Sequence, residues 1–140
     1  MTDKDLLLKK LVFIETCVEQ LRSIAKPALF ERDIKERRFV EHTLQLCIQA
    51  TQDVAAHIVA DARLGEPATN RELFTLLAGA GWISESLAET LRAAVSFRNV
   101  LVHGYVDVDI EILRDVFTYR LGDLLDFAEC VRRRIQDDQK

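Results

Sequence analysis

Residues 97–109, with the sequence FRNVLVHGYVDVD, gather several side chains that could do chemistry. Arg98 lies inside an otherwise apolar segment, His103 follows five residues later, and Tyr105 comes two residues after that. A histidine, with an ordinary pKa of ~6.5, can take or give a proton near neutral pH. An arginine stays protonated and can hold an anionic group through two parallel hydrogen bonds. The segment is therefore either a small set of reactive groups or the end of an ordinary helix.

The position of Arg98 on its helix keeps the first interpretation open. At about 100° per residue and with Leu87 at zero, the apolar side chains form one stripe between about −40° and 80°. The stripe consists of Leu87, Leu91, Ala94, Val95, Leu101 and Val102. Arg98 falls in its middle, near ~20°. An unpaired buried charge is strongly unfavourable, so we expect Arg98 to have a partner or to open onto a wet cleft.

The other polar residues of this helix form a stripe of their own. They project between about 120° and 180° on the same scale. This polar stripe consists of Arg92, Ser96, Asn99 and His103. Regular helix geometry therefore does not bring Arg98 next to His103. Either the helix distorts before Gly104, or the site is assembled from two copies of the chain.

A purely structural account of the same residues stays open. A histidine at the C-terminal end of a helix is favourable because the helix dipole prefers positive charge there. Gly104 would then be the residue that ends the helix, and Tyr105 a core aromatic with its hydroxyl at the surface.

Hydrophobic periodicity predicts five helices around this segment. The first carries apolar residues from Leu7 to Ala25 and ends before Pro27, and the second runs from about Glu31 to Ala62. Two capping patterns, Thr69-x-x-Glu72 and Ser86-x-x-Glu89, open the third and fourth helices. Asp107 or Asp109 can cap the last helix, whose apolar positions run from Leu113 to Val131. We expect an all-α protein, a single-domain bundle of four to five helices over residues 1–140.

Composition narrows the class of protein further. The formal net charge is −4, so an RNA- or DNA-binding surface would have to come from a local basic patch. The chain has no charged-then-apolar leader and no apolar run near the ~20 residues of a membrane span, which predicts a cytoplasmic protein. No residues have metal-ligand spacing, so we expect neither a metal nor a cofactor. The three cysteines read as small core residues in a reducing compartment: Cys17, Cys47 and Cys130.

The stretch RNVLVHGY has the form R-x4-H-x-Y and resembles the motif of the HEPN superfamily, in particular of HepT-type toxins. The likeness extends to ERDIKERRFVEHTLQLCIQATQDVAAHI, which is similar to the long second helix of that family. Residues 68–109 resemble its third and fourth helices, so that the resemblance covers roughly residues 5 to 135. The motif positions of the family fall here on Arg98, Asn99, His103 and Tyr105.

This resemblance implies a metal-independent endoribonuclease, the toxin of a type VII-like toxin–antitoxin module. It implies catalytic roles for Arg98, Asn99 and His103, and a homodimer in which two motif-bearing helices face one another across a cleft. It also implies a partner, a minimal nucleotidyltransferase (MNT) antitoxin that attaches AMP to Tyr105. The alternative is a non-catalytic helical module that binds a nucleotidyltransferase, with Arg98 paired to a buried carboxylate.

Overall fold

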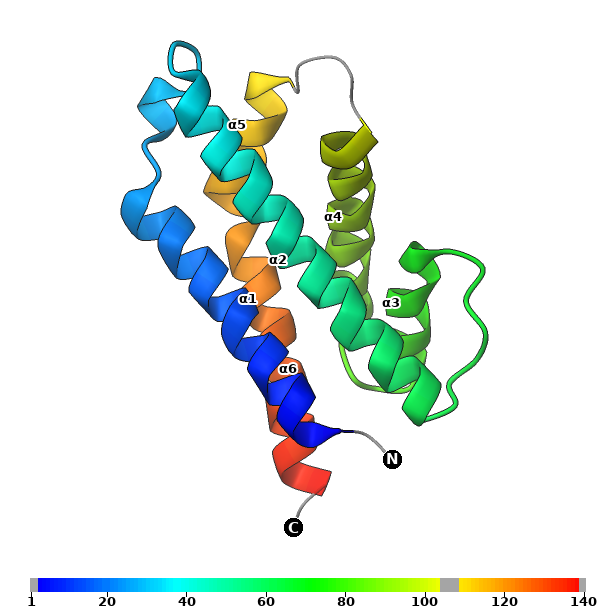
Figure 1. Cartoon of the computed structure of the whole chain (residues 1–140). Coiled ribbons are helices and arrows are strands. Elements are labelled where there is room, and N and C mark those ends of the chain that lie inside the picture. Colours follow the sequence, from blue (N-terminus) through cyan, green and yellow to red (C-terminus); the bar gives the residue numbers. More distant parts are fainter. Residues whose placement is uncertain (1–2, 104–108, 139–140) are drawn as a thin grey trace.

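The computed structural model describes residues 3–103 and 109–138, and all the regular secondary structure in these ranges is helical (Figure 1). The elements are α1 (Lys4–Ile24), the short 3-10 helix η1 (Pro27–Leu29), α2 (Ile34–Asp61), α3 (Asn70–Gly79), α4 (Glu85–His103), α5 (Ile110–Tyr119) and α6 (Leu121–Asp138). The all-α prediction is confirmed. The described residues form more helices than the predicted four to five, because two helices, α5 and α6, stand where the sequence predicted one.

Helices α1 and α2 begin at aspartates whose side chains accept hydrogen bonds from the first free backbone N–H groups. Asp3 accepts from the N–H of Leu6, and Asp33 accepts from the N–H of Lys35. The 28 residues of α2 make it about 42 Å long at 1.5 Å per residue. The sequence also predicts Ile34 as the first residue of the apolar stripe of this helix, but Ile34 is 53% exposed in the first turn and the stripe starts later.

The starts of α3 and α4 show one correct prediction and one error. At α3 the hydroxyl of Thr69 accepts from the N–H of Glu72, as the capping pattern predicted, and the Glu72 carboxylate reaches back to the N–H of Ala68. At α4 the predicted cap at Ser86 is wrong. The cap is Ser84, whose hydroxyl accepts from the N–H of Leu87 at 3.1 Å.

The break between α5 and α6 is the second correction. Arg120 has φ −111° and ψ −8°, which interrupts the helical hydrogen-bond ladder. Contacts with the segment between α1 and α2 fix the direction of α5. The Phe117 ring packs edge-on against Phe30 with 5.7 Å between centroids, and Arg114 donates to the carbonyl oxygen of Pro27.

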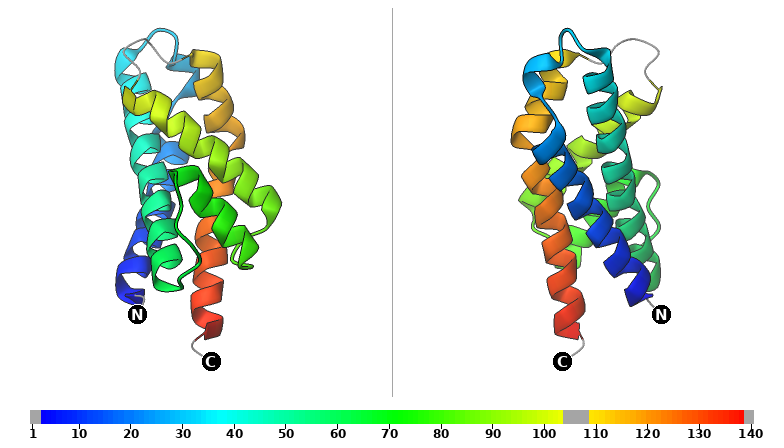
Figure 2. Two further views of the ribbon diagram at one scale, coloured as in Figure 1. Left: turned by 90° about the vertical axis from the view of Figure 1, so that its right-hand side faces the viewer. Right: turned by 60° about the vertical axis from the view of Figure 1, so that its left-hand side comes forward.

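The long helix α2 is the centre of the arrangement (Figure 1). It packs against α1, α3, α4 and α6. Figure 2 shows the same bundle from two further sides, with α3 and α4 together on one side of α2 and α1 on the other. The polypeptide therefore presents α4 on one flank of the bundle, with α3 as its immediate neighbour.

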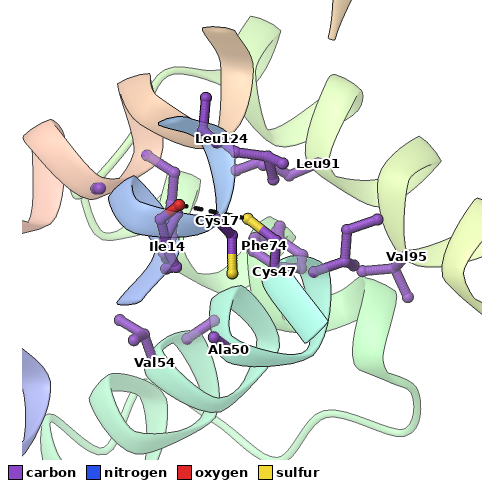
Figure 3. Close-up of a cluster of buried hydrophobic side chains, with 14 of the residues drawn as sticks. Ile14, Cys17, Cys47, Ala50, Val54, Phe74, Leu91, Val95 and Leu124 are labelled. Atoms are coloured by element: carbon purple, nitrogen blue, oxygen red, sulfur yellow. Dashed lines mark hydrogen bonds between the residues drawn. The ribbon is translucent and has the colours of Figure 1, made fainter. Parts of the chain in front are cut away.

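The core includes side chains from α1, α2, α3, α4 and α6, some of which are drawn in Figure 3. The labelled residues are Ile14, Cys17, Cys47, Ala50, Val54, Phe74, Leu91, Val95 and Leu124. Cys17 and Cys47 are buried and free, as predicted for core cysteines, and Cys130 is half-buried. A hydrogen bond with Cys17 and burial both raise the pKa of the Cys47 thiol, whose Sγ lies 3.7 Å from the carbonyl oxygen of Ile14. This packing holds α4 firmly along its first half.

Candidate active site

The last turns of α4 carry the motif and extend beyond the neighbouring helix. Helix α3 runs antiparallel to α4 and lies beside its first part, so that the C-terminal end of α4 continues past the start of α3 (Figure 1). Asn99 and Val100 are exposed there. The apolar side chain of Val100 has 53% of its surface accessible. Asn99 and Val100 are therefore accessible to another molecule at this end of α4.

Arg98 is half-buried, and its Nε is fully buried without a hydrogen-bond partner among the described residues. The N–H of a buried guanidinium is normally bonded, because an orphaned donor costs about 1–3 kcal/mol. The prediction that Arg98 interrupts the apolar side of α4 is consistent with this burial.

The helix stays regular from Arg98 to His103. It remains α-helical as far as His103, so the distortion before Gly104 that would bring Arg98 and His103 together does not occur within α4. Five residues at about 100° each leave the two positions about 140° apart around the helix axis. The side chain of His103 and the whole of Tyr105 lie outside the described residues. Of the predicted site residues, the structure describes the side chains of Arg98 and Asn99.

Polar contacts with α3 line the opposite side of α4 from the core. Arg71 Nη1 donates to the Ser96 hydroxyl at 2.9 Å, and Arg92 Nη1 donates to the Thr75 hydroxyl at 3.1 Å. Arg92 also pairs with Glu85 at 2.7 Å. Arg71 was not among the residues that the sequence predicted for the site, because only the register between α3 and α4 places it beside Ser96.

Two further observations concern metal sites and membrane-spanning helices. Within residues 3–103 and 109–138, no three His, Cys, Asp or Glu side chains gather as a metal site would require. None of the helices in the same ranges combines the length and the apolar character needed to cross a bilayer.

The chain is similar to two curated nucleases. It is 30% identical to the mRNA nuclease HepT of Shewanella oneidensis over 129 residues, which cover 91% of this chain and 97% of that protein. It is 33% identical to the tRNA nuclease HepT of Aphanizomenon flos-aquae over 75 residues, which cover 54% of this chain and 51% of that one.

A solved structure has the same architecture. The tri-AMPylated HEPN toxin of Shewanella oneidensis, in complex with its MNT antitoxin, superposes with a TM-score of 0.86 at 29% identity. The match covers 95% of this chain and 99% of the toxin. The model of the ribonuclease HepT-like family matches residues 14–131, which include α2, α3, α4 and α5 complete. The chain therefore belongs to the ribonuclease HepT-like family of HEPN proteins.

Proposed function

We propose that this protein is the toxin of a type VII-like toxin–antitoxin module and acts as a metal-independent endoribonuclease. The observation that carries the proposal is the 30% identity with an mRNA nuclease over almost the whole of both chains. The R-x4-H spacing on one unbroken helix supports it, as does Arg98, whose Nε has no hydrogen-bond partner among the described residues.

The proposed reaction uses the 2′-hydroxyl of the RNA as nucleophile. A histidine acting as base takes the 2′-OH proton, and the oxygen attacks the adjacent phosphorus. The bond to the 5′-oxygen breaks, and an acid returns a proton to that oxygen, leaving a 2′,3′-cyclic phosphate. Arg98 stabilises the extra negative charge on the phosphoryl oxygens, and Asn99 binds the phosphate or orients the imidazole.

Two copies of the chain supply the groups that one copy lacks. A single His103 per protomer does not easily serve as both acid and base, and Arg98 lies about 140° from it around α4. We propose a homodimer in which the ends of two α4 helices face each other and pair two copies of His103 across one cleft. The exposed Val100, 53% accessible, supports this face of α4 as the contact.

The experiment is RNA cleavage by the purified protein in the presence of a chelator. We expect cleavage with 2′,3′-cyclic phosphate ends, and its loss in His103→Ala while the dimer persists. His42→Ala is the matched control, because His42 is exposed on α2 and is not part of the motif. Cleavage that survives His103→Ala or depends on added metal contradicts the mechanism. A folded protein that binds an antitoxin but cuts no RNA would favour the non-catalytic module.

The proposed partner is an MNT-type nucleotidyltransferase that attaches AMP to Tyr105. The support is the solved HEPN toxin that is tri-AMPylated in its complex with an MNT antitoxin. Phosphate groups at the entrance of the cleft would exclude RNA by size and by charge. Coexpression with such a partner should add mass in AMP increments to the peptide that contains Tyr105. An unmodified peptide in a neutralised complex would indicate inhibition by binding alone.

A further inference from the structure

We infer that Arg71 binds a backbone phosphate of the RNA and positions the substrate along α4, held in place by Ser96. The inference rests on the proposed ribonuclease function and adds a residue that lies outside the R-x4-H-x-Y motif. Its basis is the contact between the first turn of α3 and the polar stripe of α4, namely the residues Arg92, Ser96, Asn99 and His103.

The register between the two helices fixes where Arg71 lies. Arg71 contacts Ser96 and, one turn later, Thr75 contacts Arg92, as expected for antiparallel neighbours. Ser96 and His103 are seven residues apart, which places them about 20° apart around the axis and about 10 Å apart along it. Arg71 thus stands on the histidine's side of α4, whereas Arg98 stands on another.

The Ser96 hydroxyl is arranged to accept from Arg71. Its single proton is directed to the carbonyl oxygen of Arg92, at 3.3 Å, so a lone pair is left for the Arg71 guanidinium at 2.9 Å. One of the five N–H donors of Arg71 is used in this bond. The remaining donors of this exposed side chain are available to a ligand.

The charge of Arg71 is not neutralised by a described neighbour. Many arginines of this chain pair with carboxylates, namely Arg38, Arg92, Arg114, Arg120, Arg132, Arg133 and Arg134. Among the residues that the structure describes, Arg71 has the neutral hydroxyl of Ser96 and no ion pair. In a chain with a net charge of −4, a cation beside the motif that has no carboxylate partner among the described residues is the kind of local feature that binding a polyanion requires.

The spacing suits a nucleic acid strand. The levels of Ser96 and His103 are ~10 Å apart along α4, which is more than one hydrogen-bond length and less than the reach of a short RNA segment. Arg71 would therefore bind a phosphate near the cleaved bond and not the scissile phosphate itself. Its contact is the same in the ground state and the transition state, so it should act on binding rather than on the chemical step.

The test measures binding separately from cleavage. All variants carry His103→Ala, so that a fluorescent single-stranded RNA stays intact, and its Kd is measured over a series of salt concentrations. We expect Arg71→Gln to weaken binding about 5- to 10-fold at low salt and to reduce the slope of log Kd against log salt by ~0.7, one phosphate contact on a single strand. Arg71→Lys should keep most of the slope. Ser96→Ala should weaken binding and leave the slope unchanged, because the charge remains.

Arg22→Gln is the matched control, an exposed arginine on α1, which packs on the other side of α2. The inference would be overturned if Arg71→Gln, Arg22→Gln and the His103→Ala parent all had the same Kd and the same slope. It would also be overturned if the His103→Ala parent did not bind RNA. In the cleavage-competent protein, Arg71→Gln should raise KM with kcat nearly unchanged. If the protein cuts no RNA but its RNA binding depends on Arg71, the proposed catalysis is wrong and the inferred phosphate contact stands. If the protein cuts RNA equally well with and without Arg71, the proposed catalysis stands and the inferred contact is wrong.

Discussion

Replacing Arg98 with methionine should make the protein more stable while it removes the proposed activity. Arg98→Met keeps an unbranched side chain of similar helix propensity and deletes the guanidinium. The Nε that it removes is buried without a hydrogen-bond partner among the described residues, a situation that costs about 1–3 kcal/mol. Because the side chain as a whole is only half-buried, we take the lower end of that range and expect a gain of ~1 kcal/mol in the free energy of unfolding.

Replacing Arg92, six residues earlier on α4, with methionine should have the opposite effect on stability. Arg92 donates to Thr75 and pairs with Glu85, and its side chain is only 19% exposed. Arg92→Met loses one hydrogen bond to a hydroxyl and one ion pair with an exposed carboxylate. We therefore expect a loss of about 1–2 kcal/mol. The pair of variants tests whether hydrogen-bond satisfaction, and not the general removal of an arginine from α4, decides stability.

Urea unfolding followed by circular dichroism gives both free energies, and it should be repeated over a range of protein concentrations. The reasoning would be refuted if Arg98→Met lost as much stability as Arg92→Met at every protein concentration. The Nε of Arg98 would then have an acceptor within the protomer. A loss that grows with protein concentration would identify a second copy as the source of the acceptor.

Two further predictions concern stability alone. Ser84→Ala should lower the free energy of unfolding by ~1 kcal/mol through loss of the α4 cap, and Ser86→Ala by less than ~0.5 kcal/mol, both measured by urea unfolding. The Arg132 guanidinium, bonded to both oxygens of Glu15, lowers the pKa of that carboxyl below its ordinary 4.5. The pair therefore stabilises the fold above that pH and loses its effect as the pH falls through the lowered pKa. Glu15→Gln should cost at most ~1 kcal/mol at pH 7, because the carboxylate is 37% exposed, and the difference from the parent should vanish in acid.

Local sequence signals predicted most of the helices, and the error at α4 shows their limit. Two serines, Ser84 and Ser86, precede the apolar run, and only Ser86 has a glutamate three residues later. Packing decided between them. Gly81 turns the chain with φ 81°, and Ile83 is 94% buried as a result, so the helix begins at the next available position. A capping pattern indicates which residues can cap a helix. Burial of Ile83, the residue before the cap, selects Ser84 among them.

Tertiary contacts account for what the sequence left open at the site. The apolar periodicity runs through Arg120 without interruption, yet Phe117 and Arg114 hold α5 against the segment that follows α1. The partial burial of Arg98 was predictable from its angle on the helix. The contact between Arg71 and Ser96 was not, because it depends on the register of two helices that a loop connects.

The shared cleft makes a quantitative prediction about mixed dimers. Suppose that parent and His103→Ala chains are unfolded together, refolded and allowed to pair at random in a two-fold symmetric dimer. If one cleft needs both histidines, only dimers of two parent chains are active. Activity then follows the square of the parent fraction and falls to about a quarter in an equal mixture. If each copy of His103 serves a separate site, whether within its own chain or with Arg98 of the partner, activity follows the parent fraction itself and stays near one half. Cleavage rates across a series of mixing ratios distinguish the two curves. A linear dependence would contradict the cleft with paired histidines. The positions of Arg98 and His103 on different sides of α4 would then belong to two separate sites in the dimer.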